Sequence, residues 1–163
     1  MKIDQLGIGE GVRHRNIRLR ALREAPDAFE SIYEDQSKWP LETWTRLLET
    51  LATFVAVLDG EDVGMVRGAQ DEDNPDSKWL ISMWVAPKAR GRGVGEALIN
   101  ALMQWASSCK AERVLLEVGK HNQPAIALYE RMDFVATGQE RAQESPRDHI
   151  IELEYERKVS LTE

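Results

Sequence analysis

The sequence has one cysteine and three histidines, which limits the chemistry that these residues can support. Cys109 has no partner for a disulfide within the chain. The histidines, His14, His121 and His149, are scattered, and no two of them stand at the spacing of zinc ligands. We therefore expect neither a disulfide framework nor a metal centre.

Long apolar runs and an excess of basic residues are also missing. No stretch approaches the roughly 18 apolar residues of a membrane span, and the first residues lack the apolar core of a signal peptide. We therefore expect a cytoplasmic protein that does not bind membranes. The formal net charge of −7 disfavours nucleic acid as a partner, because phosphates attract basic surfaces. The same charge is compatible with a cationic acceptor.

The most informative stretch, Trp79 to Glu96, predicts a strand, a glycine-rich turn and the start of a helix. Residues 79–85 are apolar or small and uncharged, which is typical of a strand buried on both faces. Glycines then alternate with other residues from Gly91 to Gly95. Beyond them, apolar residues recur at helical spacing: Val94, Ala97, Leu98, Ala101, Leu102 and Trp105.

This glycine-rich turn has the properties of a diphosphate-binding loop. Alternate glycines lack the β-carbons that would keep a ligand from the backbone, and a helix N-terminus carries unpaired N–H groups and a partial positive charge. Arg90 and Arg92 add two full charges. A plain turn before a packing helix stays open as an alternative. The G-x-G-x-x-G spacing and the Gly-Lys-Ser/Thr of a Walker loop are not present.

Two segments resemble the GNAT superfamily of acyl-CoA-dependent N-acyltransferases. Residues 85–98 read Val-Ala-Pro-x-x-Arg-Gly-x-Gly-Val-Gly-x-x-Leu, which is similar to the family's pyrophosphate-binding motif. Residues 116–134, with Leu-Glu-Val followed by Asn-x-x-Ala-x-x-Leu-Tyr-Glu-x-x-x-Phe, are similar to its downstream strand and helix. One departure is Asp133 before Phe134, where the family usually has glycine. That position ends a helix and favours the left-handed conformation.

The resemblance implies a single domain over residues 1–163 with a GNAT-type α+β fold. We expect a mixed, mainly antiparallel sheet of six to seven strands with helices on both faces. The two central parallel strands, at 79–85 and 113–118, would splay apart to admit acetyl-CoA. The expected cofactor contacts are the backbone of Met83, Trp84 and Val85, the loop residues Arg90, Gly91, Arg92, Gly93, Val94 and Gly95, and the side chains of Asn122 and Tyr129.

The resemblance also suggests catalytic residues. Tyr129 occupies the position of a tyrosine that protonates the CoA sulfur, and an unperturbed phenol has a pKa of about 10; core packing is the alternative. Glu117 interrupts an apolar strand, so it must face water, a partner or a cleft. We assign it as general base, acting through water, with a structural ion pair to Arg113 or Arg67 as the alternative. Asn122 could instead cap a helix.

The rest of the chain predicts further strands and helices. We expect strands at 2–6, 53–58, 63–69, 134–139 and 149–155, helices at 13–24, 40–51 and 124–133, and a polar loop at 70–78. The side chains of the last strand alternate in character, as in a strand with one solvent-exposed face. Among the aromatic residues between the first two helices, we assign Phe29, Tyr33 and Trp39 to a substrate pocket, with core packing as the alternative.

The resemblance implies transfer of an acetyl group from acetyl-CoA to a primary amine, by direct attack in a ternary complex and without a metal. The acceptor would be a small molecule, or a protein N-terminus or lysine. The alternative is a non-catalytic acyl-CoA-binding sensor or interaction module. Homodimers are common in the family. The sequence leaves open the acceptor, the acyl chain length and the oligomeric state.

Overall fold

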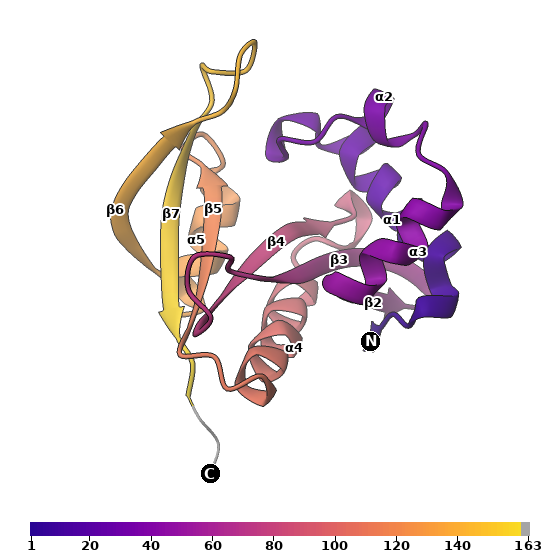
Figure 1. The fold of residues 1–163 in the computed structure, drawn as a ribbon, viewed down its shortest axis with the longest axis horizontal. Helices are drawn as coiled ribbons and strands as arrows, with labels where there is room; N and C mark the ends of the chain where they lie inside the picture. The colour runs from indigo at the N-terminus through magenta and orange to yellow at the C-terminus, as the bar shows by residue number, and fades with distance from the viewer. Residues whose placement is uncertain (161–163) are drawn as a thin grey trace.

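Residues 1–160, which the computed structural model describes, form a seven-stranded sheet flanked by helices (Figure 1). The strands are β1 (Lys2–Gln5), β2 (Ala52–Leu58), β3 (Glu61–Gln70), β4 (Ser77–Val85), β5 (Arg113–Gly119), β6 (Val135–Ala142) and β7 (Ile151–Lys158). The α-helices are α1 (Gly11–Glu24), α2 (Tyr33–Gln36), α3 (Leu41–Thr50), α4 (Val94–Ser108) and α5 (Gln123–Arg131). Short 3-10 turns are η1 (Ile8–Glu10), η2 (Pro26–Ala28) and η3 (Pro87–Ala89).

The strand order is β1-β2-β3-β4-β5-β7-β6. Within residues 1–160, every neighbouring pair is antiparallel except β4 and β5, which run parallel. The predicted mixed, mainly antiparallel α+β sheet with a central parallel pair is therefore confirmed.

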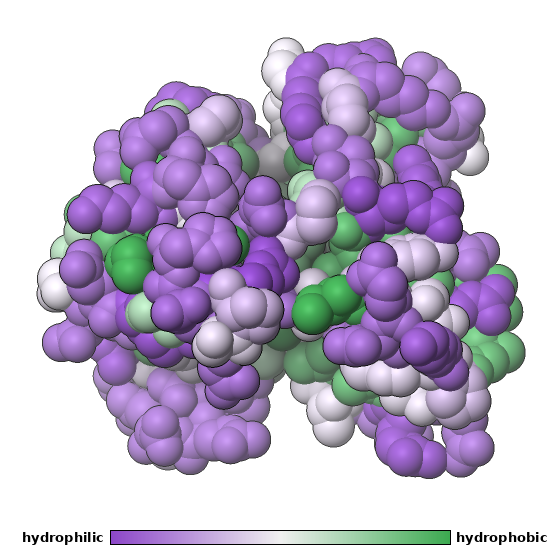
Figure 2. Space-filling view, turned by 90° about the horizontal axis from the view of Figure 1, so that it is seen from above, coloured by the Kyte–Doolittle hydropathy of each residue, from purple (hydrophilic) through white to green (hydrophobic). Residues whose placement is uncertain are grey.

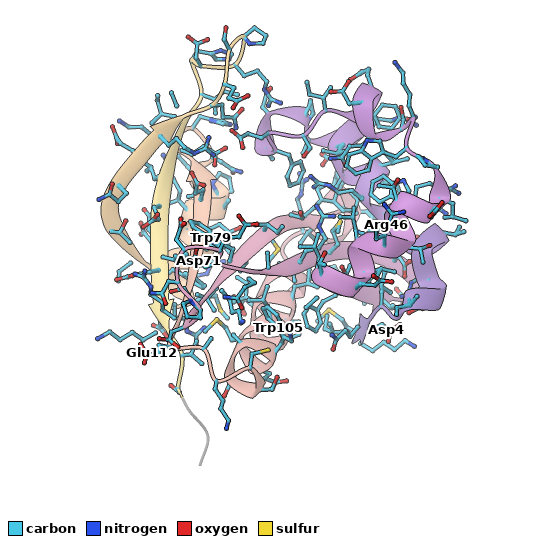
Figure 3. All side chains as sticks on the ribbon, viewed as in Figure 1. Asp4, Arg46, Asp71, Trp79, Trp105 and Glu112 are labelled. Atoms are coloured by element: carbon cyan, nitrogen blue, oxygen red, sulfur yellow. The ribbon has the colours of Figure 1, made fainter. Side chains whose placement is uncertain are left out.

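Helices cover opposite faces of the sheet, and alternate residues of β3 show which helix lies on which side. A Cβ added at Gly68 would lie 2.3 Å from Cζ3 of Trp105 on α4, so this glycine allows α4 to pack closely (Figure 3). The neighbouring Arg67 points the other way and contacts His14 on α1. We call these two sides the α4 face and the α1 face.

The core lies mainly between the sheet and α4. Of the apolar stripe predicted for this helix, Val94, Leu98 and Leu102 are each at most 1% exposed, whereas Ala97, Ala101 and Trp105 are partly exposed. Burying a leucine side chain contributes roughly 1.5–3 kcal/mol. This packing fixes α4 against β2, β3 and β4, and so fixes the loop from which the helix starts.

The pairing of β4 with β5 ends after three residue pairs, Ser77 with Arg113 through Trp79 with Leu115. Beyond that point β4 stays with β3, and β5 stays with β7. A bulge in β4, where Ser82 has a φ of 60°, accompanies the divergence. The strands therefore splay as expected, and Figure 2 shows the surface hollowed between the two halves of the molecule. We call this space the cleft.

The expected strands and helices are present, but their ends shift by up to three residues, as for β7, expected at 149–155. Residues 79–85, expected to be buried on both faces, are buried only at Leu80 and Trp84.

Three further details have local causes. Strand β4 begins at Ser77, so Lys78 belongs to the strand and not to the preceding loop. Glu152 on β7, expected on a wet face, is only 9% exposed, because Gln143 from the β6–β7 connection lies against it and donates a hydrogen bond to its carboxylate. Asp133 has a φ of 68°, so the left-handed helix end exists without glycine.

His14 is fully buried between α1, α3 and β3. Its Nδ1 lies 3.0 Å from the carbonyl oxygen of Trp44, and its Nε2 lies 3.2 Å from Nη1 of Arg67. The carbonyl requires a donor and the guanidinium an acceptor, so the ring is neutral with its proton on Nδ1. Burial, reinforced by the charge of Arg67, lowers the pKa of His14 to about 4.

We predict that this neutral histidine makes stability depend on pH. An unfolded histidine with a pKa near 6.5 binds a proton that folded His14 does not, so the free energy of unfolding should fall between about pH 6.5 and pH 4. The loss of free energy of unfolding between these pH values should amount to about 3 kcal/mol, and above about pH 6.5 none of it is lost.

Urea unfolding at several pH values would measure this contribution as the difference between wild type and His14→Asn. His149 is exposed, so His149→Asn is the matched control. In this variant the free energy of unfolding should change with pH as it does in the wild type. Identical slopes for wild type and His14→Asn would contradict the assignment.

Candidate functional site

The glycine-rich loop leads from η3 into the first turn of α4. Gly91 and Gly93 have φ values of 74° and 81°, a left-handed backbone that glycine adopts readily, and a Cβ added at either would meet no atom within 4 Å. Gly93 is the N-cap of α4 and provides no side-chain acceptor for the first N–H groups. These N–H groups, with open surface beside them, are able to donate hydrogen bonds to an anion such as a diphosphate.

Gly95 serves a different purpose from the other two glycines. A Cβ at this position would lie 2.8 Å from Cδ2 of Leu128, so its absence lets α5 lie against the first turn of α4. Arg131 on α5 also lies 3.9 Å from the carboxylate of Glu96. The close approach brings α5, and with it Tyr129, beside the loop.

The two arginines of the loop have different surroundings. The Arg90 guanidinium folds back onto β4, where Nε donates to the carbonyl oxygen of Val85 at 3.0 Å and Nη2 pairs with Glu24 at 2.9 Å. Arg92 is exposed and forms no ion pair within residues 1–160. Arg92 is therefore the loop cation that is available to a phosphate.

The end of β4 presents backbone groups to the cleft. Ala86 donates its N–H to the carbonyl oxygen of Val63 on β3 at 2.7 Å. Because successive N–H groups of a strand point to opposite sides, the N–H of Val85 points away from β3, toward the gap where β4 and β5 part. Met83 and Val85 are partly exposed, while the indole of Trp84 is buried on the α1 face and donates to Glu24.

Tyr129 is buried on α5, 5% exposed, with its ring packed edge-on to Phe134 at 5.9 Å between centroids. Within the described chain its hydroxyl has no hydrogen-bond partner, and burial raises the pKa of the phenol well above its ordinary value. Tyr129 packs in the core, and its phenol stays protonated at any physiological pH. Its surroundings therefore fit both a proton donor and a core-packing residue.

Asn122 is the N-cap of α5, and its Oδ1 accepts from the N–H of Ala125 at 3.4 Å. The helix-capping alternative thus accounts for this oxygen. The amide nitrogen of the side chain is not used by that bond.

Glu117 forms an ion pair, but with neither of the arginines expected from the sequence. Its Oε2 accepts from Nε of Arg141 on β6 at 3.0 Å, and the same guanidinium reaches Glu30 at 2.7 Å. Arg113 is instead bound to Ser77 and Glu156, and Arg67 to Ser82 and His14. The side chain of Glu117 remains 29% exposed, so water still reaches its carboxylate.

Further carboxylates, which the sequence did not predict, lie beside Glu117. The β5–β7 register pairs Glu117 with Glu154 and Gly119 with Glu152, which places all these residues on one face of the sheet. Glu152 lies within 4.0 Å of Arg141, and burial raises the pKa of its carboxyl. The sequence does not specify the strand register, and only this register shows that Glu152 and Glu154 are neighbours of Glu117.

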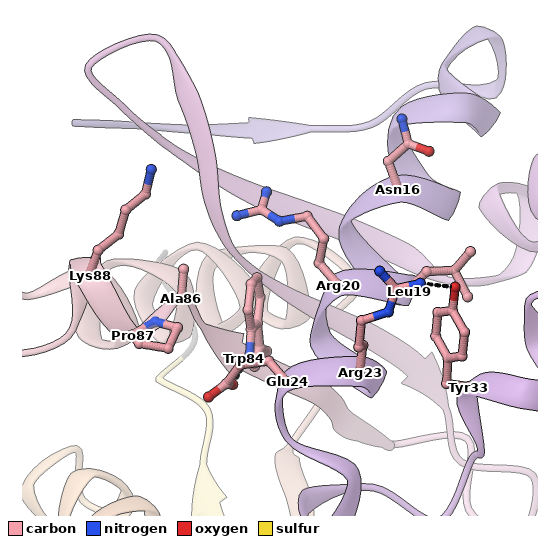
Figure 4. A pocket seen from close by; sticks show the side chains of 10 residues that line it. All are labelled: Asn16, Leu19, Arg20, Arg23, Glu24, Tyr33, Trp84, Ala86, Pro87 and Lys88. Atoms are coloured by element: carbon pink, nitrogen blue, oxygen red, sulfur yellow. Dashed lines mark hydrogen bonds between the residues drawn. The ribbon is translucent and has the colours of Figure 1, made fainter.

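The three aromatic residues assigned to a substrate pocket have separate surroundings. Trp39 packs on the buried Trp44 at 5.2 Å, and Phe29 lies under the guanidinium of Arg18. Tyr33 borders a cavity of about 790 Å³ between the flank of α1 and the end of β4 (Figure 4). That cavity is lined by Asn16, Leu19, Arg20, Arg23, Glu24, Tyr33, Trp84, Ala86, Pro87 and Lys88.

Within residues 1–160, no three His, Cys, Asp or Glu side chains gather in a way that could hold a metal ion. In the same part of the chain, none of the helices has the length and apolarity needed to cross a bilayer.

Comparison with known proteins agrees with this geometry. The model of the acetyltransferase (GNAT) family matches residues 19–134. An uncharacterized N-acetyltransferase of Methanocaldococcus jannaschii is 30% identical over 112 residues, which cover 65% of this chain and 50% of the relative. The spermine/spermidine N(1)-acetyltransferase of Bacillus subtilis is 34% identical over 71 residues, which cover 42% of this chain and 47% of the relative. The matches thus span about half the length of these curated relatives.

Among solved structures, yncA from Salmonella typhimurium, determined with its cofactor acetyl-CoA, superposes with a TM-score of 0.79. The superposition covers 100% of this chain and 96% of that chain. The sequences are 15% identical, so this likeness concerns the fold.

Proposed function

The chain belongs to the acetyltransferase (GNAT) family, and from this premise we propose that it transfers an acetyl group from acetyl-CoA to a primary amine. The observation that carries the proposal is the uncapped first turn of α4, which lies behind the open surface at Gly91 and Gly93 and next to the splayed end of β4.

The residues of this region fit acetyl-CoA. The N–H groups of the loop and the free Arg92 would hold the pyrophosphate, and the backbone of Met83 to Val85 would hydrogen-bond to the pantetheine. The Salmonella yncA structure with acetyl-CoA supports this use of the fold. When bound, acetyl-CoA supplies an acetyl group activated as a thioester.

The protein groups proposed for the reaction act on protons and on developing charge. The N–H of Val85 would stabilise the oxyanion, since it points toward the cleft. Tyr129 would protonate the departing thiolate, and Glu117 would take a proton from the amine through water. The amine would attack directly in a ternary complex, without a covalent intermediate on the protein.

The proposed acceptor is a small-molecule amine, or a protein N-terminus or lysine. The Bacillus subtilis relative, named for spermine and spermidine, supports a small amine. We further propose that the chain is one cytoplasmic domain that forms a homodimer and does not bind nucleic acid.

Two observations favour a second candidate function, a non-catalytic acyl-CoA sensor. Tyr129 is 5% exposed and packs against Phe134, and the carboxylate of Glu117 is engaged by Arg141. A sensor would keep the cofactor loop and use both residues only structurally.

We predict that Gly93→Glu abolishes acetyl-CoA binding, because it places a carboxylate among the N–H groups that would hold the pyrophosphate. Isothermal titration with acetyl-CoA, and then with CoA, would measure the loss. Gly138→Glu is the matched control, since Gly138 on β6 also has a positive φ, 91°, and open surroundings. Equal affinity of the two variants for acetyl-CoA would contradict the assignment of the loop.

Tyr129→Phe and Glu117→Gln should each lower kcat by about 100-fold or more, because each removes a proton donor or acceptor. The KM for acetyl-CoA should change little. Steady-state kinetics with an amine acceptor would test this, with Tyr155→Phe as control, since Tyr155 is a buried β7 tyrosine bonded to Glu130. Unchanged kcat in both variants would favour a different proton path, and absence of turnover in the wild type would favour the sensor.

A further inference from the structure

Two arginines lie buried on the α1 face, and neither has an acidic partner among the described residues. Arg18 on α1 is 3% exposed and Arg67 on β3 is 7% exposed. Nε and Nη1 of Arg18 are sealed from solvent and have no hydrogen-bond partner within residues 1–160. Buried guanidinium groups are ordinarily paired, because burying an uncompensated charge is costly.

The groups around the two arginines do not neutralise them. The ring of Phe29 lies 4.7 Å from Cζ of Arg18, which gives a cation–π contact but no hydrogen-bond acceptor in the plane of the guanidinium. Arg67 is bonded to Ser82 and to the neutral His14. Burial lowers the pKa of Arg18 to about 10, and burial together with the charge of Arg18 lowers the pKa of Arg67. The pair is therefore complementary to an anion.

This pair adjoins the cleft. Arg67 donates from Nε to Oγ of Ser82 at 2.9 Å, and Ser82 is the partly exposed bulge residue of β4, next to Met83. The arginines therefore stand beside the strand that would carry the thioester.

Carboxylates stand on the other side of the cleft, on the same face of the sheet. The register pairs Arg67 with Ile81 in β3–β4 and Trp79 with Leu115 in β4–β5, so Glu117 shares the face of Arg67. Glu152 joins Glu117 around Arg141, and Glu30, which comes from the segment after α1, pairs with the same guanidinium. The α1 face of the cleft thus has a cationic side and an acidic side.

We propose that Arg18 and Arg67 bind a carboxylate of the acceptor, so that the acceptor is a small molecule carrying both a primary amine and a carboxylate, as amino acids do. Nη2 of Arg18 and Nη2 of Arg67 have no hydrogen-bond partner within residues 1–160 and are not sealed from solvent, so these two nitrogens can donate to the two oxygens of the carboxylate. The amine then lies toward Glu117. This inference rests on the proposed acetyl transfer and specifies its acceptor.

The first test compares acceptors that differ only in the carboxylate. Probe sets are 2,4-diaminobutyrate with 1,3-diaminopropane, and lysine with cadaverine and lysinamide. For the wild type, kcat/KM should fall about 10- to 100-fold when the carboxylate is removed or converted to an amide, as expected for hydrogen bonds to a charged group. Equal kcat/KM values within both sets would overturn the inference while leaving acetyl transfer intact.

The second test removes the charge of Arg18. In Arg18→Met the preference for carboxylate-bearing acceptors should disappear, whereas Arg15→Met, a change on the more exposed side of the same helix, should keep it. Because no acidic group in the described part of the chain pairs with Arg18, Arg18→Met should unfold at a temperature no lower than the wild type. If Arg18→Met folds and keeps the full preference for carboxylate-bearing acceptors, whether or not its unfolding temperature falls, the role of Arg18 is purely structural.

A binding measurement separates failure of this inference from failure of acetyl transfer. The unfolding temperature of the wild type should rise with millimolar 2,4-diaminobutyrate or lysine and not with 1,3-diaminopropane or cadaverine, whether or not turnover is observed. The Arg18→Met variant should lose the rise. If Arg18→Met does not fold, acetate should still compete with the acceptor in the wild type while acetamide does not. Equal shifts by acids and amines, or equal competition by acetate and acetamide, would overturn the carboxylate site.

Discussion

The parting of β4 from β5 is the constraint on which the rest of the structure depends. A strand has two hydrogen-bonding edges, and beyond Trp79 one edge of β4 loses its partner strand. The N–H and C=O groups there need water or a ligand, because unpaired backbone groups are costly. The bulge at Ser82 turns the strand further from β5. The splay therefore leaves both open space and unpaired backbone groups, which the proposed binding of an acyl-pantetheine would use.

The splay also separates charges that a continuous sheet would bring together. Arg18 and Arg67 remain with the β3–β4 half, and Glu117 and Glu152 remain with the β5–β7 half. The net charge of −7 is a sum over the whole chain and does not show that the cleft has an arginine side and a glutamate side. The cleft lies between the two groups, and neither arginine forms an ion pair within residues 1–160, an arrangement that fits the acceptor with an amine and a carboxylate proposed above.

Local signals in the sequence were sufficient for the elements and for the glycine-rich loop. The buried face of α4 and the loop conformation at Gly91 and Gly93 are set by residues close in the sequence. Periodicity and residue type therefore predict them. The partner of Glu117 was predicted wrongly, because Arg141 reaches it across β7 in a register that no local pattern encodes. The buried state of Arg18 was likewise invisible, since charged helix residues are normally solvated.

The mouth of the cleft is bordered by polar contacts between the segment after α1 and the β6 side. Arg141 pairs with Glu30, and Arg147 donates to the carbonyl oxygen of Pro26. The side chains of Arg141 and Glu30 are 44% and 47% exposed. Exposed ion pairs contribute about 0–1 kcal/mol and are screened by salt. Ionic strength is therefore expected to set how often the mouth opens, and so the rate at which ligands enter, without altering any residue inside the cleft.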